Sequence, residues 1–161
     1  MWVLTAATLV IAFTGAVSLR LVSMEVPEKV ARGQGTRLTC GYDLEGDVLY
    51  SIKWYKDEVE FFRYVPTDRP PGQFFPLKGI QVDLGRSSNG SVYIRNVSRS
   101  TAGIYKCEVS ADAPSFQTVS AEKPMAVEES SGQAQYEADR STASFLIVTM
   151  LLILQWRYHM W

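Results

Sequence analysis

Short runs of alternating apolar and polar residues make up the chain from residue 19 to about residue 127. Gly, Pro, Asp and Asn separate these runs, and no stretch with a helical period interrupts them. A period of two places successive side chains on opposite faces of a β-strand, and short strands separated by turns are typical of a β-sandwich. The pattern therefore predicts an all-β domain over residues 19–127.

Four of the runs predict the inward faces of this sandwich, because their apolar residues are spaced two apart. The inward sets are Leu38, Cys40 and Tyr42; Tyr50, Ile52 and Trp54; Val92 and Ile94; and Tyr105, Cys107 and Val109. Residues 19–26 suit a first strand, and Pro27 suits a strand edge or a change of sheet because it cannot donate to a ladder. The four prolines between residues 65 and 77 cannot join an interior strand, so an ordered, extended loop is expected there.

The spacing of four residues indicates the type of sandwich. Trp54 lies 14 positions after Cys40, and Tyr105 lies 2 positions before Cys107. In immunoglobulin domains such a Trp covers the disulfide between the sheets, and the Tyr hydroxyl ties the corner before the second cysteine. We therefore expect an immunoglobulin-like, variable-type β-sandwich with one inter-sheet disulfide, Cys40–Cys107. Thr101 stands where variable-type domains usually have Asp, which puts in doubt the usual buried carboxylate at that corner.

The two ends of the chain predict processing and a membrane anchor. Residues 1–18 contain an apolar run too short to span a bilayer, followed by small residues, which indicates a secretory signal peptide. Secretion favours the disulfide, because an oxidising compartment lets the cysteines pair. Residues 128–144 are polar and predict a stalk or spacer.

The hydrophobic tail at residues 145–161 has two interpretations. It holds ten uncharged residues, FLIVTMLLIL, and small residues precede the polar spacer, so it matches a lipid-anchor signal with Ser130 or Ser131 as the attachment residue. Arg157 and His159 are untypical of such a signal, which leaves a short membrane segment as the alternative. The expected location is the extracellular face of the plasma membrane, with secretion as the alternative.

Composition argues against several classes of function. Sixteen Lys and Arg against 17 Asp and Glu give a net charge of −1 without a basic stripe, so nucleic acid is not an expected partner. The one histidine, His159, lies in the tail, and both cysteines are committed to the disulfide. Triad chemistry and histidine or thiolate metal sites therefore have no groups to use, and we expect no enzyme, cofactor or metal site. The carboxylates of Asp57, Glu58 and Glu60 are interpreted as solvated charge.

Two sequons predict N-glycans at Asn89 and Asn96. Asn89 begins an Asn-Gly turn, which suits an exposed position. Asn96 follows Ile94 by two and could point inward, unless the strand ends and Val97 takes the inward position. Because both sequons lie on or just before the strand around residues 91–97, glycans would shield that sheet, and a partner is expected on the opposite one.

On that opposite sheet, the inward phase of Trp54 and Cys107 leaves five residues facing outward: Ser51, Lys53, Tyr55, Lys106 and Glu108. A two-residue turn at Asp57 and Glu58 would place Phe61 in the core and Phe62 and Tyr64 outward, whereas a three-residue turn would reverse this. The alternative is that these aromatics are core or scattered surface residues. The candidate partner-binding residues are Lys53, Tyr55, Phe62, Tyr64, Lys106 and Glu108.

Several segments carry a family resemblance: YDLEGDVLYSIKWYKD, FFRYVP, FFPLKGIQVDL and KCEVSADAPSFQTVS. Over about residues 19–125 the chain resembles the first immunoglobulin domain of the beaten path family of insect neuronal surface proteins. The resemblance implies a role in axon guidance and synaptic partner choice, through binding to sidestep-family immunoglobulin receptors on other cells. Members of that family commonly carry sequence resembling a second domain, where a stalk and tail are expected here. The alternatives are a soluble secreted ligand or decoy, homophilic adhesion and, more distantly, an immune opsonin.

Overall fold

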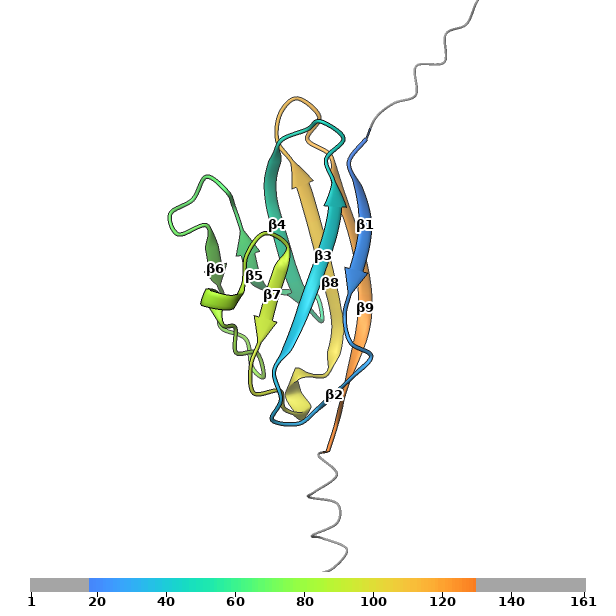
Figure 1. Cartoon of the computed structure of the whole chain (residues 1–161), viewed down its shortest axis with the longest axis vertical. Coiled ribbons are helices and arrows are strands. Elements are labelled where there is room, and N and C mark those ends of the chain that lie inside the picture. The colour runs from blue at the N-terminus through green and yellow to red at the C-terminus, as the bar shows by residue number, and fades with distance from the viewer. Residues whose placement is uncertain (1–17, 130–161) are drawn as a thin grey trace, which may run out of the picture.

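Residues 18–129, which the computed structural model describes, form two β-sheets packed face to face (Figure 1). One sheet has the order β1-β3-β7 and the other the order β2-β9-β8-β4-β5-β6. The strands are β1 (Arg20–Glu25), β2 (Lys29–Ala31), β3 (Thr36–Asp43), β4 (Leu49–Lys56), β5 (Val59–Tyr64), β6 (Gly72–Phe74), β7 (Ser91–Ile94), β8 (Gly103–Ala111) and β9 (Thr118–Glu128). The predicted all-β, variable-type sandwich is confirmed.

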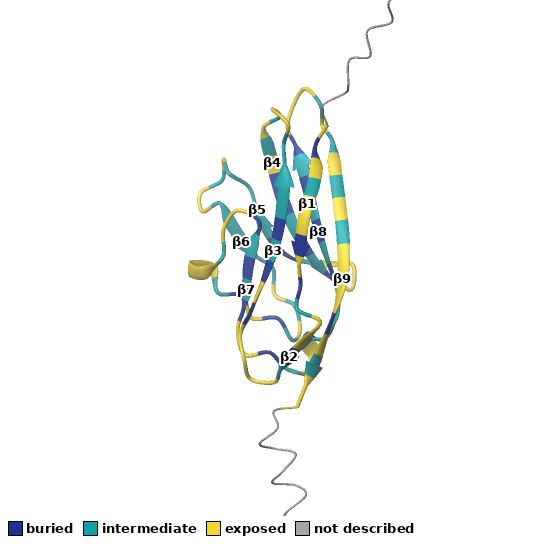
Figure 2. Ribbon diagram, turned by 45° about the vertical axis from the view of Figure 1, so that its right-hand side comes forward, coloured by how far each residue is buried: buried dark blue, intermediate teal, exposed yellow. Residues whose placement is uncertain are grey.

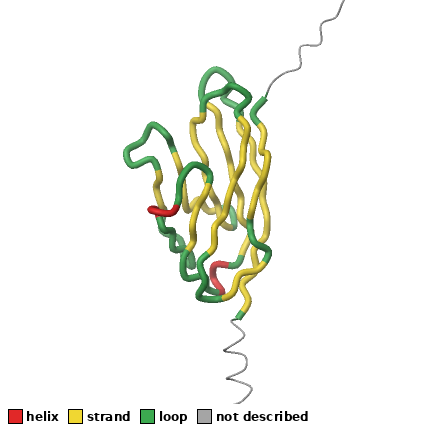
Figure 3. The backbone as a smooth tube through the Cα atoms, viewed as in Figure 1, coloured by secondary structure: helices red, strands yellow, loops and turns green. Residues whose placement is uncertain are grey.

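Within residues 18–129 the helical content is two single 3₁₀ turns, η1 (Leu84–Arg86) and η2 (Arg99–Thr101), drawn in red in Figure 3. Between residues 18 and 129 no helix has the length and apolar character needed to cross a bilayer. The predicted signal peptide falls outside the described residues except for Ser18. Ser130, Ser131 and the rest of the predicted spacer and tail fall outside them as well.

The chain changes sheet at Pro27, as the sequence predicts. Strand β1 pairs antiparallel with β3, whereas β2 pairs in parallel with β9 in the other sheet. Pro27 lies in the short link between β1 and β2 and therefore has no ladder bond to donate.

A covalent bond ties the two sheets at their centre. Cys40 on β3 and Cys107 on β8 form the predicted disulfide, with a Cα–Cα distance of 6.4 Å. Trp54 is fully buried, and its Nε1 donates to the carbonyl oxygen of Gly90 at 3.3 Å. Figure 2 shows buried residues alternating with more exposed ones along the strands, so the core lies between the two inner faces.

Thr101 occupies the corner position at which variable-type domains usually bury a carboxylate. It is fully buried, and its Oγ1 donates to the carbonyl oxygen of Gly79 at 2.6 Å and accepts from the backbone N–H of Ser98 at 2.9 Å. A neutral hydroxyl therefore satisfies the buried backbone groups of this corner without a charge.

A bulge in β4 overturns one of the predicted orientations. The register against β8 shifts between Leu49 and Ser51, so Tyr50 is the extra residue, and it is 53% exposed. The prediction that Tyr50 faces the core is therefore wrong. Ser51 pairs with Ser110 and keeps the phase of Lys53, but it is only 1% exposed, so the prediction that it faces solvent is wrong as well. One extra residue in a strand reverses the alternation on its far side, and nothing local in the run marks where this happens.

A second bulge changes which aromatic side chains are buried. Asp57 and Glu58 form the expected two-residue turn, both with positive φ (47° and 65°), and Lys56 pairs with Val59. Beyond the turn, Glu60 pairs with Tyr55 but Phe62 pairs with Trp54, which leaves Phe61 as the extra residue.

Both phenylalanines are consequently buried, each with no exposed area. The prediction that Phe62 faces outward is wrong. Tyr64, in phase with Phe62, packs partly buried against the core, so its outward orientation is wrong as well.

The proline-rich segment is not a loop throughout. Gly72–Phe74 form β6, which pairs antiparallel with β5 at the edge of the six-stranded sheet. Pro70 and Pro71 precede this strand, so no proline within it has to donate to the ladder. The extended-loop prediction is wrong for these three residues.

Candidate interaction surface

Four of the six predicted partner-binding residues lie together on the outer face of the six-stranded sheet. Lys53 on β4 is paired with Glu108 on β8, and Tyr55 is paired with Lys106. Side chains that face each other across neighbouring strands are close enough to interact directly. Phe62 and Tyr64 do not belong to this group, because they face the core.

These four side chains form a connected network. Lys53 Nζ lies 3.2 Å from Glu108 Oε1, and the Tyr55 hydroxyl donates to the same oxygen at 3.3 Å. Lys106 Nζ stands 4.9 Å from the centroid of the Tyr55 ring and also pairs with Glu58. Each charge is therefore held by a neighbour, which fixes side chains that would otherwise move independently.

The titration behaviour of the network fits this geometry. Partial burial, together with the negative charges of Glu108 and Glu60, raises the pKa of Tyr55 to about 12. Its hydroxyl is therefore protonated at neutral pH and donates to Glu108. The hydrogen bond to Glu58 raises the pKa of Lys106 above its usual value, so this ammonium group keeps its charge.

Arg63 on β5 extends the network toward the sheet edge. It is paired with Lys53 on one side and with Gln73 on β6 on the other. Its guanidinium binds both carboxylate oxygens of Glu60, at 2.7 and 3.0 Å, and its Cζ lies 5.5 Å from the centroid of the Phe75 ring. The hydrogen bond to Glu60 raises the pKa of Arg63 above its usual value. We call this surface the charged sheet face, defined by Lys53, Tyr55, Arg63, Lys106 and Glu108.

The list of candidates drawn from the sequence missed Arg63, because its outward position follows from the bulge at Phe61. Once Phe62 is known to face inward, alternation places Arg63 outward. No feature of the local sequence VEFFRY distinguishes the two registers. Knowledge of the strand pairing would have been needed to find it.

The two sequon asparagines are exposed beside β7, in the three-stranded sheet. Asn89 has a φ of 42° in the turn that leads into β7, and its Oδ1 accepts from the Tyr42 hydroxyl at 2.7 Å. Asn96 follows the end of the strand and is exposed, whereas Val97 is buried. Both sequons thus belong to the sheet opposite the charged sheet face; their glycosylation stays a prediction.

The carboxylates of the β4–β5 hairpin have basic partners. Asp57 pairs with Lys56, Glu58 with Lys106 and Glu60 with Arg63. Within residues 18–129, no three His, Cys, Asp or Glu side chains cluster in a way that could hold a metal ion. These acidic groups therefore serve ion pairs of the domain itself.

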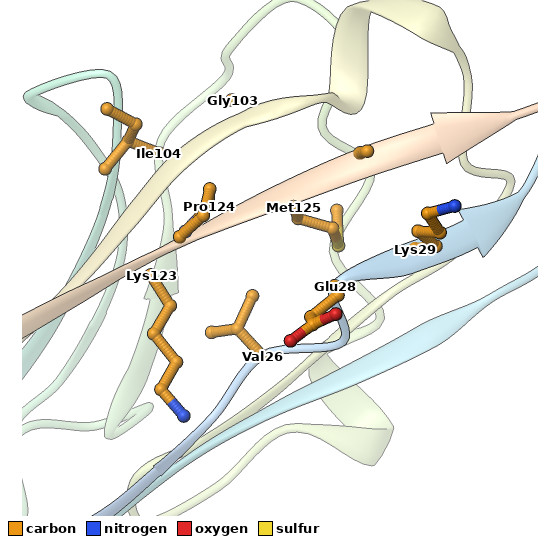
Figure 4. Close-up of a pocket in the computed structure, with 9 residues that line it drawn as sticks. Val26, Glu28, Lys29, Gly103, Ile104, Lys123, Pro124 and Met125 are labelled. Carbon is orange, nitrogen blue, oxygen red and sulfur yellow. The ribbon is translucent and has the colours of Figure 1, made fainter.

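One apolar groove, of about 750 Å³, lies where the chain crosses from β1 to β2. Its apolar lining includes Val26, Ile104, Pro124 and Met125, and Figure 4 shows the amino groups of the neighbouring lysines pointing away from Met125. Three charged residues, Glu28, Lys29 and Lys123, also line the groove.

Comparisons with known proteins agree with this architecture. Residues 24–125 match the family model of the immunoglobulin V-set domain. Among curated proteins, none matches the chain. The V domain of amphioxus IgVJ-C2 is 22% identical, with a TM-score of 0.50 over 62% of this chain and 97% of that one.

A chain from the mouse coronavirus receptor-binding domain complexed with its murine receptor is 18% identical, with a TM-score of 0.51 over 70% of this chain and 54% of that one. At these identities, the two structures show a shared fold.

Proposed function

The chain belongs to the immunoglobulin V-set family, and from this premise we propose that it is a cell-surface recognition protein whose charged sheet face binds another protein. The partner we propose is a further member of the immunoglobulin superfamily, of the sidestep type, on an opposing cell. The biological setting that fits such contacts is axon guidance or synaptic partner choice. The resemblance to the beaten path family supports these two finer points.

The observation that carries the proposal is the connected network of Lys53, Tyr55, Lys106 and Glu108. Aromatic and arginine side chains are enriched at the centres of protein interfaces, and this surface combines Tyr55 with Arg63. Their ion pairs and hydrogen bonds already order these long side chains in the unbound protein. Less conformational entropy is then lost on binding, which favours affinity.

The alternation of charge on this face supports selective binding. Lys53 and Glu108 face each other, and Arg63 lies beside Lys53. A partner with complementary charges meets favourable potentials, whereas one with like charges at these positions is rejected at a cost of several kcal/mol. The charged sheet face is thus suited to discriminate among related receptors.

The test is a binding screen of the full chain, displayed on cells, against the extracellular immunoglobulin proteins of the same organism. Tyr55→Ala should weaken binding to the identified partner by about thirtyfold, corresponding to about 2 kcal/mol. Tyr93→Ala, on the opposite sheet, is the size-matched control and should leave binding unchanged. Glu108→Ala and the exposed Glu25→Ala form a second pair, matched in charge. The proposal would be contradicted if the controls lost partner binding while Tyr55→Ala and Glu108→Ala retained it.

The same cells distinguish the alternative modes of action. Aggregation of cells that express only this protein would indicate homophilic adhesion, and accumulation in the medium would indicate a soluble ligand. For the lipid anchor we propose at Ser130 or Ser131, phosphatidylinositol-specific phospholipase should release the protein. A mature surface protein that still contains Trp161 would contradict that anchor.

A further inference from the structure

Two guanidinium groups gather around one aromatic ring on the outer face of the three-stranded sheet. Arg86, at the end of η1, places its Cζ 3.4 Å from the centroid of the Tyr93 ring, and Arg37 on β3 places its Cζ 5.8 Å from the same centroid. Arg37 also donates to the backbone carbonyl oxygen of Arg86 at 3.2 Å. Figure 1 shows η1 close to β7, the strand that carries Tyr93. We call this group the arginine pair.

The arginine pair has no anionic partner in the part of the chain that the structure describes. Four other arginines form ion pairs: Arg20 with Asp43 and Glu45, Arg32 with Glu129, Arg63 with Glu60 and Arg99 with Glu129. Arg69, which is exposed, donates only to the backbone carbonyl oxygens of Pro66 and Asp68. Over residues 18–129, no carboxylate oxygen lies within 4.0 Å of the guanidinium nitrogens of Arg37 or Arg86. The same holds for Arg95, which is exposed and follows Tyr93 by two positions. The chain as a whole carries a net charge of −1, so this positive charge is a local feature.

The arrangement fixes two like charges near each other although they repel. The face of an aromatic ring attracts cations, and the Arg86 carbonyl gives Arg37 a hydrogen-bond acceptor. These contacts orient the guanidinium groups but leave their charge without a counter-charge from the protein. A guanidinium is a planar fork that binds oxyanions through two parallel N–H groups, and one held in place loses little entropy on binding.

From this geometry we propose that the arginine pair, with Arg95, binds a sulfated polysaccharide chain of the glycosaminoglycan type. Such a chain carries repeated oxyanions, which several guanidinium groups on one sheet face can engage at once. A V-set domain with a disulfide is typical of the extracellular space, where such chains occur. An acidic surface of a protein partner is the alternative occupant, because arginine is also enriched at protein interfaces, and the experiment below distinguishes the two. An anionic membrane is less favoured, since recognition of lipid headgroups typically uses clusters of four to eight basic residues.

The site is separate from the charged sheet face. Tyr93 and Arg37 lie in the three-stranded sheet, whereas Tyr55 and Glu108 lie in the six-stranded one. The two predicted N-glycans, at Asn89 and Asn96, would flank β7 on the same sheet, so the proposal requires that a linear polysaccharide chain reaches the arginine pair between them. A polysaccharide on this side and a protein partner on the other could then bind simultaneously. The proposal does not depend on the proposed function.

The experiment measures binding of the purified full chain, with its glycans intact and in mild detergent, to immobilised heparin over a range of NaCl concentrations. The test variant is Arg37→Ala/Arg86→Ala. The control is Arg20→Ala/Arg99→Ala, which also removes two positive charges, but at positions outside the arginine pair. Thermal unfolding of each variant verifies that it is folded.

Wild type should bind at physiological salt, with an affinity that falls as salt rises because counterions are released from the polyanion. If each guanidinium contact counts as one phosphate contact does on B-DNA, about 0.9, the slope of log K against log salt should become less negative by about 2 in the test variant and remain unchanged in the control. The variant Arg37→Lys/Arg86→Lys, which keeps both charges, should bind with intermediate affinity and serves if the alanine variant does not fold.

Three outcomes would overturn the proposal. The first is equal weakening of the test variant and the control, which would reflect total charge alone. The second is absence of heparin binding at physiological salt. The third is stronger binding to phosphatidylserine vesicles or to polyglutamate than to heparin, which would indicate a membrane or an acidic protein as the ligand.

Discussion

The Tyr105 hydroxyl donates a 2.5 Å hydrogen bond to the backbone carbonyl oxygen of Thr101, four residues earlier, and both residues are fully buried. The bond ties strand β8 to the turn η2 that precedes it. Burial raises the pKa of Tyr105 well above its usual value, so the hydroxyl is a donor throughout the physiological pH range.

Replacing Tyr105 by Phe should therefore lower the free energy of unfolding by about 1–3 kcal/mol, because a buried carbonyl loses its side-chain donor. Urea unfolding measures the change. Tyr50→Phe is the matched control. The Tyr50 side chain is 53% exposed, so this substitution should change the free energy of unfolding by no more than about 0.5 kcal/mol. Equal stabilities for the two variants would contradict a stabilising role of the Tyr105 bond.

Loss of the disulfide should prevent secretion of folded protein. Cys40 and Cys107 are 67 positions apart, and closing a loop of that length restricts the unfolded chain by about 4 kcal/mol. That is a large share of the stability of a small domain. The experiment measures how much folded protein is secreted by cells that express the Cys107→Ser variant. Normal secretion of this variant, with native-like thermal unfolding, would refute the expectation.

Substitution of Gly90 by Ala should destabilise more than the same change at Gly46. Both glycines have positive φ, 87° and 101°, so both alanines carry backbone strain of about 1 kcal/mol. A Cβ at Gly90 would also lie 2.6 Å from the carbonyl oxygen of Cys40, whereas a Cβ at Gly46 meets nothing within 4 Å. Unfolding free energies of the two variants compare these costs directly, and a smaller loss at Gly90 would show that this site relaxes.

Asp57 should contribute to acid sensitivity. A hydrogen bond from Lys56, followed by one from the backbone N–H of Ile104, lowers the pKa of Asp57 below its ordinary value of 3.8. A carboxyl with a depressed pKa in the folded state stabilises the protein above its unfolded-state pKa, and this stability is lost as pH falls through the folded-state value. Urea midpoints between pH 7 and pH 2 should therefore fall less steeply below pH 4 in Asp57→Asn than in wild type. Parallel curves would exclude the contribution.

Glycosylation should follow the exposure of the two sequons. Asn89→Gln and Asn96→Gln should each remove one glycan, visible as a step in electrophoretic mobility of the secreted chain. Because both residues lie beside β7, neither change should weaken binding of a protein partner to the charged sheet face. An unshifted band for either variant would show that its sequon is not used.

The spacing of a few residues along the chain was enough to predict the type of fold. Cys40, Trp54, Tyr105 and Cys107 are spaced so that one disulfide, its covering indole and the tyrosine corner can form only when two sheets pack together. Alternating residues on β3, β7 and β8 determine which side faces the core, because a strand repeats every two residues. Pro27 marks the change of sheet for an equally local reason, since it cannot donate a ladder bond.

The orientation of residues beyond a bulge depends on the partner strand and is visible only in the folded protein. A single unpaired residue near Tyr50, and another at Phe61, reverses the faces on its far side, and the partner strand determines where that residue falls. The bulge at Phe61 turns Phe62 into the core and Arg63 to the outer face of the sheet, although the run VEFFRY permits either phase. The arginine pair likewise depends on strand pairing: Arg37 meets Arg86 and Tyr93 because β3, which is distant in sequence from η1 and β7, pairs with β7.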